Sequence, residues 1–149
     1  MRPEDLSGFV SISDPEIHPD GRRVAFVVVR MDLDQDKYHK QVWLWDGEAA
    51  RPFTHGPADT RPRWSPGGGS LAFLRATGEE GKPPQVAVMP AAGGEATAVT
   101  SFPLGASEAE WSPDGTRLAV VGTEWTGECR LLTARSGSHD FSRMSALSA

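Results

Sequence analysis

Three ten-residue stretches of this sequence align without gaps and decide the fold. They read IHPDGRRVAF at residues 17–26, WSPGGGSLAF at 64–73 and WSPDGTRLAV at 111–120. The proline of each stretch lies 47 residues before the proline of the next. Two equal intervals between matching stretches indicate an internal repeat, in which each repeat is one supersecondary unit stacked on its neighbours.

The centre of each stretch has the residues of a tight hairpin turn. Proline presets φ near about −65°, aspartate accepts hydrogen bonds from its local backbone, and glycine adopts the left-handed conformation that closes the loop. The second stretch has Gly67 in place of the aspartate and so loses one local side-chain bond. We therefore predict structural turn residues at Pro19, Asp20, Gly21, Pro66, Gly67, Gly68, Pro113, Asp114 and Gly115.

The strands predicted on either side of these turns are apolar on both faces. The run 24–29 is apolar throughout, and in the run 41–45 Val42 and Leu44 point away from Trp43 and Trp45. A matching third strand is expected at 85–89, and fourth strands near 51–54 and 96–100. Strands buried on both faces lie between layers. We expect the structural core to include Trp64, Trp111, Trp43 and Trp45.

Four short antiparallel strands per repeat are typical of a β-propeller blade. We predict an all-β fold, a partial β-propeller of about three four-stranded antiparallel blades near residues 14–55, 60–101 and 107–134. Residues 135–149 have no Pro-Asp-Gly turn and little alternation. This last segment is interpreted as a low-complexity tail or as the product of a shifted reading frame.

Composition and charge exclude several protein classes. The chain of 149 residues contains 16 Gly and 12 Pro, together 28 residues or about 19%. Average usage of these two residues is roughly 12%, so the excess fits frequent turns. A net charge of −5 without any cluster of Lys or Arg argues against a nucleic-acid surface. The longest apolar run is six residues, whereas a membrane span needs about 20, so no membrane partner is expected.

The termini and the single cysteine add two expectations. Residues 1–6 have no apolar core and no small-residue cleavage site, so we expect no secretory signal and a cytoplasmic location. Cys129 cannot form an internal disulfide and is expected to be a small buried thiol.

No motif in the sequence predicts a catalytic nucleophile. Ser70 and Ser107 lie in the nearest matches to the Gly-x-Ser-x-Gly elbow of α/β-hydrolases. Both matches end in alanine, and neither precedes a helical pattern. The repeat places Ser70 just after a turn and Ser107 just before a strand, which explains both serines structurally.

The remaining candidates for chemistry also have structural explanations. Asp32, Asp34 and Asp36 lack the glycine and glutamate of a calcium loop, and the glycines at 67–69 lack the Lys-Ser/Thr of a phosphate loop. The histidines have no partners at metal-ligand spacing; they are His18, His39, His55 and His139. We predict no catalytic residue, no metal site and no cofactor, and expect the purified chain to be inactive alone.

Beyond the repeat, the sequence resembles bacterial acylaminoacyl-peptidase-like enzymes of the prolyl oligopeptidase family of serine peptidases. The resemblance covers roughly residues 1–122. TolB-like propellers share the Pro-Asp-Gly repeat, so the opening segment and the Gly-Gly-Glu stretch favour the peptidases. The resemblance rests on MRPEDL at 1–6, SDP at 13–15, HPDGRRVAFVV at 18–28, QVWLW at 41–45, GGEA at 93–96, VT at 99–100, PLG at 103–105 and WSPDGTRLA at 111–119.

The resemblance implies a non-catalytic role. In such enzymes a propeller of about seven blades caps an α/β-hydrolase domain, admits short or N-acylated peptides and excludes folded proteins. The catalytic residues lie in the hydrolase domain, and no position of this chain matches them. The implied partners are that domain and the remaining blades. The alternative is a free-standing TolB-like or WD-repeat-like scaffold that binds protein partners, although Trp45-Asp46 does not recur as a WD signature would.

Three blades leave two outer faces uncovered. Each face would expose apolar side chains of the kind that neighbouring blades normally bury. For the first blade, either Trp43 and Trp45 or Val42 and Leu44 would be exposed. We expect the isolated chain to self-associate, or to remain partly unfolded until other blades or a partner cover it.

Overall fold

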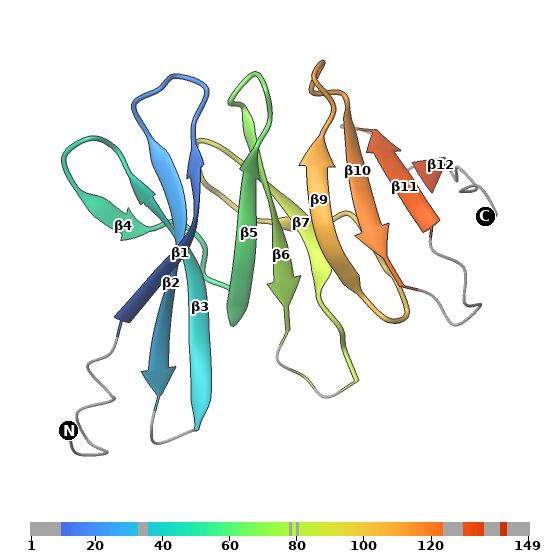
Figure 1. Ribbon diagram of the computed structural model, residues 1–149, viewed down its shortest axis with the longest axis horizontal. Coiled ribbons are helices and arrows are strands. Elements are labelled where there is room, and N and C mark those ends of the chain that lie inside the picture. Colours follow the sequence, from blue (N-terminus) through green and yellow to red (C-terminus); the bar gives the residue numbers. More distant parts are fainter. Residues whose placement is uncertain are drawn as a thin grey trace.

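The computed structural model describes residues 10–32, 36–77, 79, 81–123, 130–135 and 141–142. This described part contains strands and turns and no helix, so the predicted all-β class is confirmed. The strands follow one another along the chain in three successive groups (Figure 1).

Each group contains four strands and is called a blade below. Blade one consists of β1 (Val10–Ile17), β2 (Val24–Asp32), β3 (Lys37–Trp45) and β4 (Ala50–Pro52). Blade two consists of β5 (Ala58–Trp64), β6 (Ser70–Ala76), β7 (Gln85–Pro90) and β8 (Thr97–Ala98). Blade three consists of β9 (Ala106–Trp111), β10 (Arg117–Gly122), β11 (Arg130–Arg135) and β12 (Phe141–Ser142).

Within each blade, consecutive strands pair antiparallel. A single parallel pair, Lys40 with Ala58, joins β3 to β5. Blades one and two therefore share one open eight-stranded sheet, while blade three is a separate four-stranded sheet. Neither sheet closes on itself, so the fold is a partial propeller.

The three repeat stretches form turns of one geometry. The φ angles of Gly21, Gly68 and Gly115 are 68°, 69° and 68°, in the left-handed region that favours glycine. In each turn the glycine N–H donates to the carbonyl three residues earlier, at 2.8, 2.7 and 2.8 Å. The turns end β1, β5 and β9 and begin β2, β6 and β10.

Aspartate side chains stabilise two of these turns by accepting hydrogen bonds from the backbone N–H groups of residues that follow them. Oδ1 of Asp20 accepts from the Arg22 N–H at 2.8 Å, and Oδ1 of Asp114 accepts from the Thr116 N–H at 3.0 Å. The hydroxyl of Ser112 donates to Asp114 and is the main cause that lowers the pKa of this carboxyl to about 2. A carboxylate held by several donors favours its charged form.

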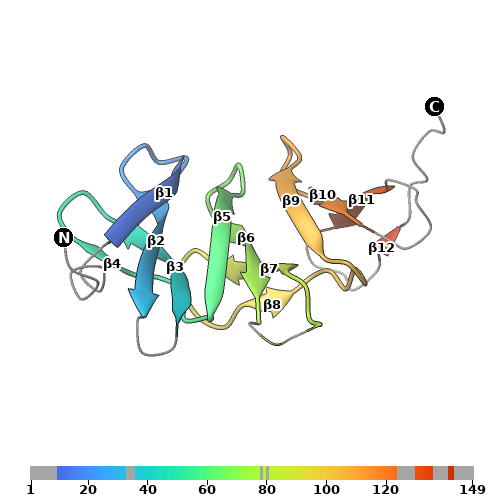
Figure 2. The same cartoon turned by 60° about the horizontal axis from the view of Figure 1, so that its bottom comes forward.

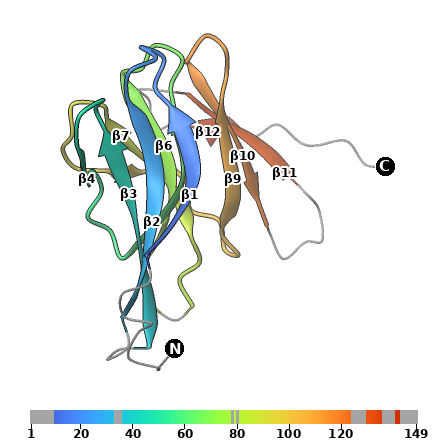
Figure 3. The ribbon, with the colours of Figure 1, turned by 60° about the vertical axis from the view of Figure 1, so that its left-hand side comes forward.

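The core lies between the blades, and Figure 3 shows blades one and two overlapping with blade three (orange and red) to their side. One apolar cluster joins blade one to blade two, and the other joins blade two to blade three. Blade two is therefore packed on both faces, as its alternating apolar residues require. The first cluster consists of Ala25, Val27, Val42, Leu44, Trp64, Leu71, Phe73, Ala87 and Met89, and the second of Ala72, Leu74, Val86, Phe102, Ala106, Ala109, Leu118 and Val120.

The four tryptophans expected in the core differ in burial. Trp64 is 5% exposed, whereas Trp43 and Trp111 are only half-buried. The expectation for Trp45 is wrong, because 41% of this residue is exposed. Trp45 and Trp43 lie on the face of blade one that is turned away from blade two, where neither inter-blade core cluster includes them.

The end of the chain departs from the expected boundary. Phe141 and Ser142, inside the segment 135–149 expected to be a tail, pair with β11 as β12. This pairing supplies the fourth strand of blade three. Apart from these two residues and Arg135, the rest of the predicted tail lies outside the described residues, and so does Cys129.

Candidate functional site: the inner strands and the linked turns

The first strands of the three blades lie next to one another. Figure 2 shows β1, β5 and β9 side by side along one side of the molecule, with β8 and β12 along the other. In propellers the blades surround a central channel. We call the surface formed by β1, β5 and β9 the inner face.

Charged side chains connect the inner strands at the period of the repeat. Nε of Arg63 on β5 donates to Glu110 of β9 at 3.2 Å, and Nη1 of Arg63 lies 4.0 Å from Glu16 of β1. Each glutamate is 47 residues from Arg63. One guanidinium thus lies between carboxylates from both neighbouring blades.

A second ion pair repeats this pattern one step along the strands. Nη1 of Arg61 donates to Glu108 at 3.2 Å, again across 47 residues. Both side chains are about half exposed, at 47% and 54%. Exposed ion pairs contribute little to stability, about 0–1 kcal/mol, so these groups remain free to exchange partners with a charged ligand.

Bulges in β1 and β5 lie beside these charged residues. Asp14 and Arg61, which precede prolines, have φ angles of 50° and 53°. The pairing register shifts at both positions. A bulge bends its strand and redirects a side chain, and non-glycine residues at positive φ are uncommon and often mark functional positions.

Burial raises the pKa of one acid of the inner face. Partial burial raises the pKa of the Glu16 carboxyl above its usual value, and the nearby Arg63 guanidinium opposes this effect. Glu16 is the least exposed of the three glutamates on this face, with 30% of its side chain exposed. The inner face therefore presents Arg61, Glu108 and Glu110 most openly to solvent.

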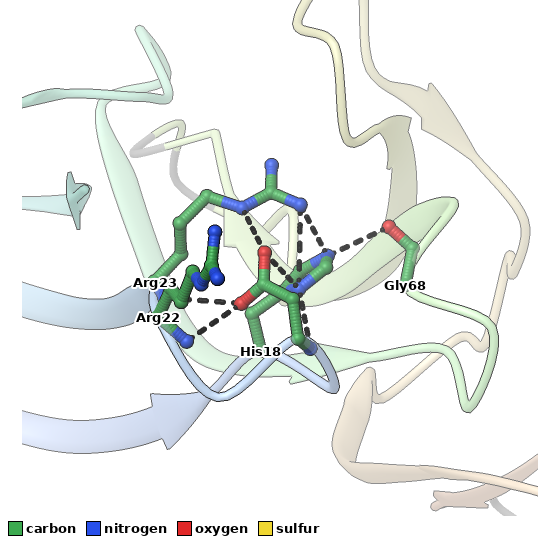
Figure 4. Close-up of polar contacts among 5 residues, drawn as sticks. His18, Arg22, Arg23 and Gly68 are labelled. Carbon is green, nitrogen blue, oxygen red and sulfur yellow. Dashed lines mark hydrogen bonds and ion pairs between the residues drawn. The ribbon is translucent and has the colours of Figure 1, made fainter. Parts of the chain in front are cut away.

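The turns of blades one and two are linked through His18 (Figure 4). Its Nδ1 accepts from the Asp20 N–H at 3.1 Å, and its Nε2 lies 3.0 Å from the Gly68 carbonyl oxygen of the next turn. The ring also contacts two side chains of its own turn, with Nδ1 3.0 Å from Asp20 Oδ2 and Nε2 2.9 Å from Arg23 Nη2. The ring also meets Trp64 edge to face, with centroids 4.7 Å apart.

His18 therefore does more than fill a turn position. Ser65 and Ser112 occupy the same repeat position, and the hydroxyls of both accept a hydrogen bond within their own turns. The imidazole reaches across to blade two instead and is 5% exposed. These contacts make it a structural link between blades.

A second buried polar group has a structural partner. Asp59 is fully buried, and its carboxylate accepts from Arg75 at 2.8 and 2.9 Å and from the Gly56 N–H at 3.1 Å. A buried carboxylate needs such compensation, since an unpaired charge in the interior is costly. Asp59 therefore has a clear role in holding β5 to β6.

The other candidates from the sequence remain scattered. Ser70 begins β6, and the Ser107 hydroxyl is 3.4 Å from the Val121 carbonyl oxygen. His39 lies 3.5 Å from Asp32, and His55 is exposed between β4 and β5. Asp36 begins the described segment before β3, whereas Asp34 and His139 lie outside the described residues.

The described residues contain neither a candidate metal cluster nor a candidate membrane-spanning helix. They contain no group of three or more His, Cys, Asp or Glu side chains arranged to hold a metal ion. They also contain no helix with the length and apolar character to cross a membrane.

The inner-face charges were missed by sequence reasoning, although the repeat could have found them. The alignment of the three stretches starts at the residue before each turn. Extended backward by a few residues, it places Asp14, Arg61 and Glu108 at one repeat position, and Glu16, Arg63 and Glu110 at another. An acid, a base and an acid in order predict ion pairs between adjacent repeats.

The chain is similar in sequence to one curated peptidase. No family model matches the chain. Over 128 residues the chain is 38% identical to an uncharacterized peptidase, YuxL, of Bacillus subtilis, an alignment that covers 84% of this chain and 19% of YuxL. The resemblance to the propeller part of a peptidase is confirmed.

Solved structures show the same propeller fold. The β-propeller domain of the Trilobed protease from Pyrococcus furiosus, described as having an open velcro topology, superposes with a TM-score of 0.74 at 22% identity over 91% of this chain and 42% of that one. Acylaminoacyl peptidase from Pyrococcus horikoshii gives 0.71 at 19% identity over 92% and 25%. TolB from Acinetobacter baumannii gives 0.60 at 15% identity over 93% and 44%.

The peptidase-related propeller described here is short relative to these proteins. It spans about a fifth of its curated relative and a quarter to less than half of the solved chains. The resemblance therefore concerns only a part of each of these proteins.

Proposed function

We propose that this chain is a non-catalytic gating and substrate-selection module of an acylaminoacyl-peptidase-like serine peptidase that acts on short or N-acylated peptides. The observation that carries the proposal is the inner face, where acids and arginines of three adjacent blades alternate at ion-pair distances of 3.2–4.0 Å. A charged wall beside a channel selects among passing peptides by their own charges.

The exposed pair Arg61 and Glu108 is the part of this wall best suited to contact a peptide. Arg61 can release Glu108 and bind a peptide carboxylate, because a guanidinium pairs equally well with either group. Glu108 can bind the side-chain ammonium of a peptide lysine in the same way.

The test uses the complete translation product that carries this segment and a series of N-acetylated peptides differing only in charge. We expect Arg61→Glu to lower kcat/KM for acidic peptides relative to basic ones by about tenfold, which corresponds to about 1.4 kcal/mol. The double variant Arg61→Glu with Glu108→Arg should restore most of the ratio. Selectivity that does not respond to either variant would contradict the proposal.

A matched control is available in the same blade. Lys82 and Glu79 form an exposed ion pair at 2.6 Å in the connection between β6 and β7, away from the inner strands. Lys82→Glu removes the same kind of pair and should leave the ratio unchanged. If it changes the ratio as Arg61→Glu does, the effect comes from overall charge and not from the inner face.

A free-standing scaffold that binds protein partners is the second candidate. The shared fold with TolB favours it, whereas the 38% identity to a peptidase favours the first. A complete translation product without peptide hydrolysis would support the scaffold.

A further inference from the structure

One face of blade one carries large apolar side chains that no other blade covers among the described residues. Five residues define this back face of blade one. Pairing across β1, β2 and β3 places Ile17, Val24 and Trp45 in one row and Phe26 and Trp43 in the next. Because directly paired residues lie on the same side of a sheet, all five share one surface.

The same register positions in blade two are buried. The repeat relates Ile17, Val24 and Phe26 to Trp64, Leu71 and Phe73, and strand pairing relates Trp43 and Trp45 to Ala87 and Met89. All five counterparts are at most 5% exposed and belong to the cluster that packs on blade one. The back face of a blade is therefore built to receive the opposite face of another blade.

That opposite face, the forward face, has its own residue pattern. In blade one it presents Ala25, Val27, Val42 and Leu44 to blade two, and in blade two it presents Ala72, Leu74 and Val86 to blade three. It is made of small and branched side chains, whereas the back face carries the larger ones. Small residues leave room for the large ones to interdigitate.

The described residues include exposed apolar side chains on one surface of each kind. On the back face, Ile17 is 68% exposed and Trp45 is 41% exposed. Ile12 of β1 pairs with Val28, lies on the same face and is 65% exposed. On blade three, Ala119 and Val121 occupy the forward-face positions of Ala25 and Val27, and Val121 is 38% exposed. Apolar patches of this kind usually mark interaction sites.

We propose that two copies of this chain associate head to tail, with the forward face of blade three in one copy packed on the back face of blade one in the other. The contact would repeat the blade-to-blade packing that each copy already contains twice. Such an interface is heterologous, since the two surfaces differ, and it closes into a ring when the rotation between copies permits. This inference concerns the 149-residue chain by itself, because in the complete peptidase proposed above the remaining blades would occupy both faces.

The experiment is sedimentation of the full 149-residue chain over a range of concentrations. We expect species heavier than the 16.0 kDa monomer. Trp45→Glu blocks the back face and Val121→Glu blocks the forward face, because each places a charge in an apolar contact. Each variant alone should raise the dissociation constant at least about tenfold.

Mixing the two variants distinguishes head-to-tail packing from other modes. A Trp45→Glu copy keeps its forward face and a Val121→Glu copy keeps its back face, so the mixture should form dimers and nothing larger. Back-to-back association would respond to Trp45→Glu, remain unaffected by Val121→Glu and show no rescue on mixing.

Two further variants serve as controls. Ile17→Glu, at a 68% exposed position, should act like Trp45→Glu with little effect on folding, which circular dichroism checks. Leu104→Glu changes an apolar residue of equal exposure to Val121, in the connection before β9, and should have no effect. A monomer at all concentrations, or association that ignores both face variants, would overturn the proposal.

Discussion

Replacing Trp64 by alanine is expected to lower the free energy of unfolding by about 3–5 kcal/mol. The indole is 5% exposed and lies between the blades, in contact with His18 and Phe53. Burying about 200 Å² of aromatic surface at about 25 cal/mol/Å² gives an upper bound near 5 kcal/mol. A loss of this size is a large part of the stability of a small domain.

Trp111 at the same repeat position provides the control. It is half-buried, and its Nε1 donates to the Arg63 carbonyl oxygen at 3.0 Å. Trp111→Ala should therefore cost less, about 1–3 kcal/mol. Urea titration of both variants measures the difference. Equal losses would contradict the fuller burial of Trp64 in the first cluster relative to Trp111, which only packs against the edge of the second cluster.

The fold class was predictable because the repeat carries its information locally. The turn residues around Gly21, Gly68 and Gly115 are consecutive, and their conformations depend on proline and glycine geometry more than on distant contacts. The apolar runs that follow them define strands buried on both faces. Together these local signals identified an all-β propeller, which the structure and its relatives confirm.

Burial of individual side chains was less predictable, because it depends on which blades are neighbours. Trp43 and Trp45 have the apolar character of core residues, and the pattern alone placed them there. The structure packs Val42 and Leu44 against blade two, leaving Trp45 exposed on the other face. Alternation shows that a strand has two faces and does not show which face a neighbour covers.

The contact between His18 and Gly68 was equally inaccessible from the sequence. The two residues are 50 positions apart and lie in turns of different blades. In the alignment His18 is a substitution at a serine position and Gly68 is one of three equivalent glycines. Only the packing of blade one on blade two brings the imidazole to the glycine.

This contact leads to the second large effect, a strong destabilisation by Gly68→Ala. A Cβ at this position would lie 2.6 Å from Cε1 and Nε2 of His18, in a ring held by the Asp20 backbone and by Trp64. The φ angle of 69° adds strain for any L side chain, about 1–2 kcal/mol. With the steric conflict we expect a total loss of about 2–5 kcal/mol.

Gly21 separates the two causes, because it has a φ angle of 68° and no atom within 4 Å of its Cβ position. Gly21→Ala should therefore cost only the backbone strain. Replacing His18 by serine, the residue found at the other two turns, should reduce the cost of Gly68→Ala to that of Gly21→Ala. Double-mutant analysis of urea unfolding measures this coupling. Equal losses for Gly68→Ala and Gly21→Ala with His18 in place would show that the imidazole does not constrain the second turn.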